Sequence, residues 1–198
     1  MVTAAVIGGI GSGKTAVTDL LAEHGAAVVD ADVVAREVVA PGSETLKRLV
    51  EAFGDEVRAP DGSLDRAALA ALAFAHPAAT TRMNAIIHPA IGVALAQQVA
   101  AARLTHDVVV VAIPLFRPEH RTLLALDEVV CVDVDPDVAL ARLVAQRGFS
   151  AEDARLRMAA QSPRDERVAM CDVVLDNSGT MSDLKGKVDE LWHRLTRR

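Results

Sequence analysis

The sequence contains no Tyr, and aromatic residues make up only 3% of its 198 residues. Because hydrophobic residues still account for 51%, Val, Leu, Ile and Ala must fill the core of one domain, or of one domain with an insertion. The chain carries 21 basic and 27 acidic residues, a net charge of −6, which does not favour a nucleic-acid-binding surface.

The chain has only two cysteines, Cys131 and Cys171, and they form neither a zinc-ligand spacing nor a CxxC pair. We therefore expect two buried free thiols in a reducing cytosol. The N-terminus lacks the basic region of a signal peptide, and no apolar run approaches the length of a membrane span. These absences predict a cytoplasmic protein with neither a membrane nor a nucleic-acid partner.

The most informative stretch is GGIGSGKT at residues 8–15, which fills every fixed position of the phosphate-binding pattern G-x-x-x-x-G-K-[ST]. Glycines let backbone N–H groups approach an anion, and the helix that follows directs its positive end toward it. We expect Lys14 to reach the β- and γ-phosphates of ATP, and the Thr15 hydroxyl to bind Mg²⁺. The expected ATP contacts in this stretch are Gly9, Ile10, Gly11, Ser12, Gly13, Lys14, Thr15 and Ala16.

Two other interpretations of this stretch are weaker. Gly9 and Gly11 also begin a dinucleotide-binding fingerprint, with Asp30 at about the distance of the ribose-binding acid. The third glycine position is Lys14, however, which would crowd the contact between helix and strand. A turn that binds nothing is disfavoured because an apolar strand at 2–7 precedes the loop and a helical pattern follows it.

Five apolar segments, at 2–7, 26–29, 107–113, 128–134 and 172–175, alternate with helical patterns. This alternation predicts an α/β fold, a three-layer structure with a five-stranded parallel sheet. We assign 1–53 and 106–198 to a nucleotide-binding core. Residues 54–105 contain no convincing strand and form a predicted helical insertion. Proline disfavours helix at the residue before it, so we expect a kink or a helix boundary at His88-Pro89.

Capping residues predict where several helices begin. Ser43 and Asp135 are expected N-caps, the latter with Pro136 at the first helical position. Ser150 with Asp153, and Ser162 with Asp165, form capping-box pairs. The two short helices that follow them belong to an arginine-rich region. Six arginines occupy one 26-residue stretch, namely Arg142, Arg147, Arg155, Arg157, Arg164 and Arg167.

These motifs together resemble the dephospho-CoA kinase family. The matches are GGIGSGKT (8–15), VVDADVVAREVV (28–39), PG (41–42), FG (53–54), DGSLDRAAL (61–69), NAIIHP (84–89), IPL (113–115), R…QRG (142–148), Gln161 and DNSG (176–179). The resemblance implies ATP-dependent phosphorylation of the ribose 3′-hydroxyl of dephospho-CoA by a P-loop kinase. It also implies a helical CoA-binding segment at 54–105 and a lid at 148–163. We expect a monomer or weak homo-oligomer.

One segment departs from the family pattern. After the third strand the family tends to have PLL-x-E, whereas this chain has Pro114-Leu115-Phe116-Arg117-Pro118-Glu119. The acid is displaced by about a residue, so we carry over no role for Glu119. No acid clearly ends the third strand either, which leaves Thr15 as the only predicted metal ligand.

Phosphoryl transfer to an alcohol needs positioning, charge neutralisation and a group that orients or deprotonates the hydroxyl. Asp32 is our candidate for the last role, because we expect it to end the strand beside the glycine loop; the alternative is an N-cap. Arg142 and Arg147 are candidates for stabilising the transferring group, since guanidinium binds phosphate with a planar fork. The alternative is that Arg142 and Arg147 are solvated arginines on a helix surface without a catalytic role.

The remaining candidates rest on the resemblance. It places Arg36, Arg66 and His88, together with Asp32, against the CoA-side substrate, although a His before Pro is as often a structural cap. Asn177 is expected at the adenine of ATP, although DNSG is also a good turn sequence. The other arginines of the cluster, Arg155, Arg157, Arg164 and Arg167, are expected to be surface or lid charges.

The alternatives in function are a nucleotide-dependent switch, another small-molecule kinase, or a nucleoside monophosphate kinase. The N-K-x-D guanine signature of GTPases does not occur in the sequence. A nucleoside monophosphate kinase would share the core and lid but would lack the DGSLDR…HP helical insertion.

Overall fold

The computed structural model describes residues 1–197 and divides into two compact units. The first joins Met1–Asp30 to the chain from Val99 onward, and the second is Ala31–Gln98. The helical unit is therefore larger than the segment at 54–105 outlined from the sequence, because two helices before that segment also pack within it.

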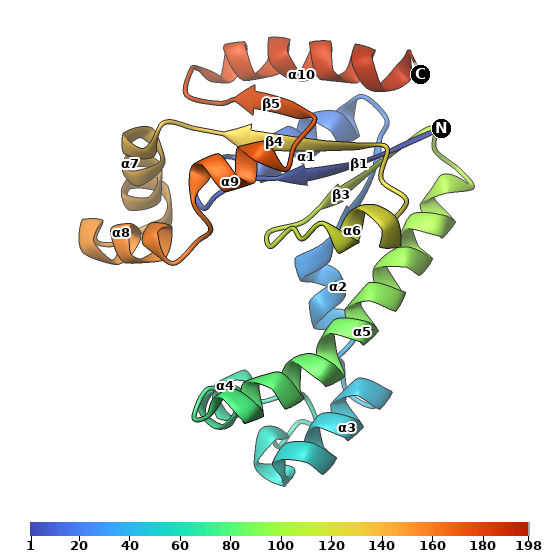
Figure 1. The fold of residues 1–198 in the computed structure, drawn as a ribbon, viewed down its shortest axis with the longest axis vertical. Helices are drawn as coiled ribbons and strands as arrows, with labels where there is room; N and C mark the ends of the chain where they lie inside the picture. The colour runs from blue at the N-terminus through green and yellow to red at the C-terminus, as the bar shows by residue number, and fades with distance from the viewer. Residues whose placement is uncertain (198) are drawn as a thin grey trace. The chain divides into compact units, whose positions relative to one another are not determined.

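The first unit contains a parallel five-stranded sheet, as the sequence predicted (Figure 1). The strands lie in the order β2-β3-β1-β4-β5. Their bounds are β1 (Val2–Ile7), β2 (Ala27–Asp30), β3 (Val108–Ala112), β4 (Glu128–Asp133) and β5 (Val173–Asp176). β1 is central and buried along its whole length, which agrees with its uninterrupted apolar sequence.

Helices α1 (Lys14–Glu23) and α10 (Met181–Thr196) cover one face of the sheet. An apolar stripe of α10 is buried there and consists of Leu184, Val188, Leu191 and Leu195. On the other face α9 (Arg164–Ala169) packs against β4. Arg103, at the end of α5, donates from Nε to the Thr3 hydroxyl at 2.8 Å. The short α6 (Glu119–Leu123) also belongs to this unit.

A buried ion pair joins α10 to the sheet. The Glu128 carboxylate on β4 is fully buried, and Arg194 Nε donates to both of its oxygens at 2.9 and 3.0 Å. The carboxylate raises the pKa of Arg194. Removing the arginine would leave an uncompensated buried charge, so this pair fixes the position of the C-terminal helix.

Helices α7 (Pro136–Arg147), α8 (Ala151–Ala159) and α9 follow the carboxyl end of β4 (Figure 1). The Asp135 and Ser150 caps are confirmed, and Gly148 ends α7 with a left-handed φ of 67°. The predicted Ser162 cap is wrong, because α9 begins one residue later with Pro163 at the N-cap position. The ring of Pro163 fixes φ near −50° and suits the extended cap conformation.

The second unit consists of helices around a small apolar core. It contains α2 (Ala31–Glu37), α3 (Glu44–Phe53), the 3₁₀ helix η1 (Asp55–Val57), α4 (Arg66–Ala73) and most of α5 (Pro77–Arg103). Ser43 caps α3 as predicted. The buried core residues are Val39, Leu49, Val57, Leu69, Ala73 and Ile86.

Helix α5 continues through Pro89, so of the two outcomes expected at His88-Pro89, a kink or a helix boundary, the boundary is wrong. Proline costs the helix one backbone hydrogen bond. Ile86 before it and Leu95 after it are both buried on the same helix, and their packing supports helix on both sides of the proline.

By length and composition alone, α5 is apolar enough to cross a membrane, with a mean hydropathy of 1.5 over 18 residues. Polar residues interrupt each of its apolar runs, so the sequence alone did not indicate a span here. A single helix of this kind is weak evidence for a span, since core helices have the same composition.

Cys131 is buried in β4, but Cys171 is only half-buried, so the expectation of two buried thiols is wrong for Cys171. Both cysteines are free. Cys171 lies between α9 and β5, in a turn that leaves its side chain partly open to solvent.

Candidate functional site

The loop at residues 8–15 connects β1 to α1, and its glycines are required by the surrounding backbone. Gly11 and Gly13 have φ values of 78° and 87°, which side chains rarely adopt. A Cβ on Gly8 would lie 2.4 Å from the Val132 carbonyl oxygen, and one on Gly13 would lie 2.3 Å from Asn177 Nδ2. Neighbouring atoms therefore pack so close to the loop backbone that Gly8 and Gly13 leave no room for a side chain.

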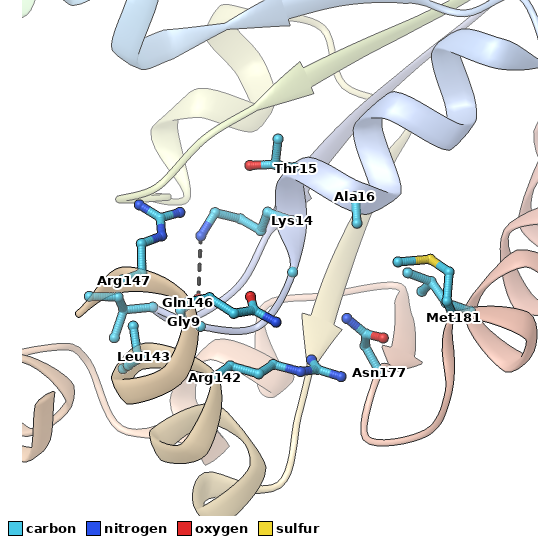
Figure 2. Close-up of a pocket in the computed structure, with 14 residues that line it drawn as sticks. Gly9, Lys14, Thr15, Ala16, Arg142, Leu143, Gln146, Arg147, Asn177 and Met181 are labelled. Atoms are coloured by element: carbon cyan, nitrogen blue, oxygen red, sulfur yellow. Dashed lines mark hydrogen bonds between the residues drawn. The ribbon is translucent and has the colours of Figure 1, made fainter. Parts of the chain in front are cut away.

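Lys14 extends back along the loop (Figure 2). Its Nζ donates to the carbonyl oxygen of Gly8 at 2.7 Å and to that of Gly9 at 3.4 Å. Thr15, the next residue, is exposed. In the part of the chain that the structure describes, Ser12 Oγ is the one buried side-chain polar atom without a hydrogen-bond partner. A cradle of glycines with an ammonium group across it fits a polyphosphate.

A cavity of about 360 Å³ opens beside the loop. Arg142, Gln146 and Arg147 of α7 line one side, and Asn177 and Met181 line another (Figure 2). The predicted loop contacts lie here, except for Ser12, which lines a neighbouring cavity. The structure thus brings together the predicted ATP residues and both candidate arginines of α7.

Asn177 and Arg142 are the side chains at the Gly13 end of the loop. Asn177 is buried, and its Nδ2 donates to the Ser12 carbonyl oxygen at 2.8 Å. Arg142 Nη1 would lie 3.9 Å from a Cβ on Gly13. Arg142 is half-buried, whereas Arg147 lies exposed at the end of α7. The two arginines therefore differ in how firmly the fold holds them.

Four residues near the loop were not among the predicted site residues, and they line a cavity of about 300 Å³. Gln161 Oε1 accepts from the Ile10 backbone N–H at 2.8 Å. Arg164 Nε donates to both oxygens of Asp133 at 2.9 and 3.0 Å, and this bond lowers the pKa of Asp133. Arg167 is half-buried beside them. Asp133 is an acid at the end of a buried parallel strand, and that position is the signal in the sequence that could have identified it.

Asp32 does not end the strand beside the glycine loop. β2 ends at Asp30, and β3 lies between β2 and the loop-bearing β1. Asp32 is the second residue of α2, so it is not the N-cap of that helix either. It is exposed, and its carbonyl oxygen accepts from Arg36 Nε at 3.0 Å. Asp32 therefore neither ends the strand nor caps the helix, because α2 begins directly after β2 without a loop.

The other acceptor-side candidates, Arg36, Arg66 and His88, lie with Asp32 in the helical unit. Arg66 begins α4 and lines a mostly apolar cavity of about 200 Å³ with Leu64 and Met83. His88 lies exposed on α5. Of Asp32, Arg36, Arg66 and His88, Arg66 lines this cavity within the helical unit.

Metal binding has one candidate side chain in the loop, Thr15. Within residues 1–197 no group of three or more His, Cys, Asp or Glu side chains is placed to hold a metal ion. Mg²⁺ in nucleotide sites is commonly bound by one or two protein groups together with phosphates and water. The single hydroxyl of Thr15 at the start of α1 is compatible with that donor set.

Comparisons with known proteins agree with this geometry. The family model described as dephospho-CoA kinase matches residues 2–183. The curated dephospho-CoA kinase of Streptomyces avermitilis is 45% identical over 198 residues, covering 100% of this chain and 96% of that protein. The one from Thermobifida fusca is 42% identical, covering 100% and 98%.

Solved structures share the architecture. TT1252 from Thermus thermophilus has a TM-score of 0.80 at 29% identity, covering 98% of this chain and 97% of its own. Shikimate kinase from Bacteroides thetaiotaomicron has a TM-score of 0.58 at 14% identity, covering 98% of each chain, which shows a shared fold alone. The phosphate loop and the full-length matches lead to one conclusion: this chain belongs to the dephospho-CoA kinase family.

Proposed function

We propose that this protein transfers the γ-phosphoryl group of ATP to the ribose 3′-hydroxyl of dephospho-CoA, giving coenzyme A and ADP. The observation that carries the proposal is the cavity between the GGIGSGKT loop, Arg142 and Asn177, in a chain that matches this family along its length. The cavity supports the nucleotide half of the reaction, and the family match supports the acceptor.

On the nucleotide side, the loop amides and Lys14 bind the phosphates, and Asn177 lies toward the adenine. Mg²⁺, held by Thr15 and the phosphates, supplies charge neutralisation at the transferring group. Arg142 stabilises the transferring phosphoryl group from the half-buried face of α7, and Arg147 adds charge from its exposed end.

On the acceptor side, Asp32 accepts or orients the proton of the ribose hydroxyl as general base. Arg36, Arg66 and His88 bind the CoA-side substrate, with the cavity at Arg66 offering apolar contact. The segment 148–163, which contains α8, closes as a lid over ATP. The enzyme acts in the cytoplasm as a monomer or weak homo-oligomer, without nucleic-acid or membrane partners.

The experiment is an assay of ADP formation from ATP with dephospho-CoA, run beside nucleoside monophosphates, shikimate and gluconate. We expect dephospho-CoA alone to support turnover, and mass spectrometry to detect coenzyme A. Faster turnover of a nucleoside monophosphate would overturn the assignment of the acceptor in favour of the nucleoside monophosphate kinase alternative.

A further inference from the structure

Different side chains flank the two ends of the phosphate loop. Asn177 and Arg142 lie at the Gly13 end. At the other end a Cβ on Gly9 would meet Arg167 Nη2 at 3.1 Å and Gln161 Oε1 at 3.2 Å. Gly9 therefore leaves just enough space for a guanidinium and an amide from the segment that follows α8.

Arg167 is held at Gly9 by its surroundings. Arg164, one turn earlier on α9, makes a bidentate pair with the buried Asp133 at the end of β4. Arg167 Nη1 donates to the Ser162 carbonyl oxygen. Gln161 Oε1 accepts from Ile10 N–H at 2.8 Å, so the residues just before α9 contact the loop directly. Side-chain motion of Arg167 is limited by these contacts, which lowers the entropy cost of binding an anion.

Arg167 also lies where two cavities meet. It lines the cavity of about 300 Å³ beneath α8 and another of about 260 Å³ at the carboxyl ends of β1 and β3. The second cavity contains the arginine of the divergent segment, Arg117, beside Phe116. Arg197, exposed just after α10, lines neither.

The direction of the nucleotide follows from the proposed function. Asn177 marks the adenine end of the loop, near Gly13. Lys14 Nζ reaches the Gly8 and Gly9 carbonyl oxygens, and so marks the end where the terminal phosphates lie. Arg167 lies against Gly9, whereas Arg142 lies against Gly13. The two arginines therefore approach the phosphates from opposite ends of the loop.

We propose that Arg167 is a catalytic residue that contacts the γ-phosphoryl group during transfer, an inference that rests on the proposed function. The bond between the γ-phosphorus and its bridging oxygen breaks, and that oxygen leaves on ADP. A new bond joins the phosphorus to the acceptor oxygen, whose proton passes to Asp32. Arg167 stays protonated and stabilises the charge on the equatorial oxygens.

The test compares nucleotide binding and turnover in Arg167→Ala, with Arg197→Ala, outside both the lid and the cavities, as the control. Because ADP lacks the γ-phosphate, Arg167→Ala should weaken ATP binding by about tenfold and leave the ADP dissociation constant within about twofold. It should lower kcat by about 10² to 10³. Arg197→Ala should keep both affinities and kcat within about twofold, as expected for an exposed side chain.

A second variant separates catalysis from folding. Arg167→Lys keeps the charge but loses the fork, so its kcat should lie between those of Arg167→Ala and the wild type. Guanidinium added to Arg167→Ala should raise its kcat, an effect that a purely structural role would not produce. Equal loss of ATP and ADP affinity, or a kcat within about threefold of wild type, would overturn the proposal.

The binding measurements need no acceptor, so they remain informative if the acceptor assignment fails. In that case the wild type would not phosphorylate dephospho-CoA, yet the Arg167→Ala substitution would still weaken ATP binding and leave ADP binding nearly unchanged. If instead Arg167 has no such role, the wild type would make coenzyme A, and the Arg167→Ala substitution would change the ATP and ADP affinities by the same factor.

Discussion

The two compact units present their candidate residues in different ways. In the first, Lys14 and Asn177 are bonded to the backbone of the phosphate loop, and the loop follows a strand that is buried throughout. In the second, Asp32, Arg66 and His88 lie exposed on helices. The residues that we propose for the nucleotide are thus largely fixed by the fold, whereas those that we propose for the acceptor are exposed at a surface. Substitutions in the two units should fail in different ways.

Lys14→Ala should cause the largest loss. Removing an ammonium group aimed at the developing charge costs on the order of 3 kcal/mol or more, so kcat should fall by about 10² to 10³. The fold should persist, because β1 is buried by its own apolar side chains and the hydrogen bonds lost from Nζ are confined to the Gly8 and Gly9 carbonyl oxygens. Steady-state assays beside a thermal melt test this, and near-normal kcat in a folded variant would contradict it.

Asp32→Asn should lower kcat by about a hundredfold, since a general base contributes 10² to 10⁴ in rate. The amide keeps the size of the side chain but loses its basicity, so ATP affinity and thermal stability should be unchanged. Single-turnover phosphorylation at saturating ATP is the measurement. A variant that retains more than about a third of wild-type kcat would exclude the base role.

Arg66→Gln should act on the acceptor alone. Loss of one charge-assisted hydrogen bond costs about 1.5 to 3 kcal/mol, so KM for dephospho-CoA should rise by about tenfold or more. The KM for ATP and the kcat should change little, because Arg66 lies in the helical unit. A parallel rise in the KM for ATP would show that the two units do not divide the substrates as proposed.

Arg164→Gln should give the smallest change, in the pH dependence of stability. The pair with Arg164 lowers the pKa of Asp133 from its ordinary value of 3.8. A lowered folded-state pKa adds stability above pH 3.8 that is lost as the pH falls below it. The fall in Tm between pH 6 and pH 3 should therefore be smaller in Arg164→Gln than in the wild type. Equal falls would show that the pair contributes little.

Local signals in the sequence predicted the parts of the fold that depend on neighbouring residues. The strand at Val2–Ile7 and the Ser43 and Asp135 caps were predicted because each depends on interactions within a few residues. The cap of α9 failed where proline competed with Ser162, and the boundary at Pro89 failed because packing sustained the helix.

Long-range arrangement could not be predicted in the same way. Chain order placed β2 beside the loop, but β3 pairs between β2 and β1. The contact from Gln161 to Ile10 joins residues 151 apart in the sequence, and no local pattern indicates it. For the same reason Arg167 was expected to be a surface or lid charge, although the structure places it against Gly9.

Isothermal titration calorimetry with ADP and with dephospho-CoA, each titrated alone into Lys14→Ala and Arg66→Gln, tests the division between the two units most directly. We expect Lys14→Ala to lose ADP affinity by about tenfold or more while dephospho-CoA affinity stays near wild type, and Arg66→Gln to show the reverse. If either variant loses both affinities together while its melting temperature is unchanged, the two substrates do not bind through separate units, and the account is contradicted.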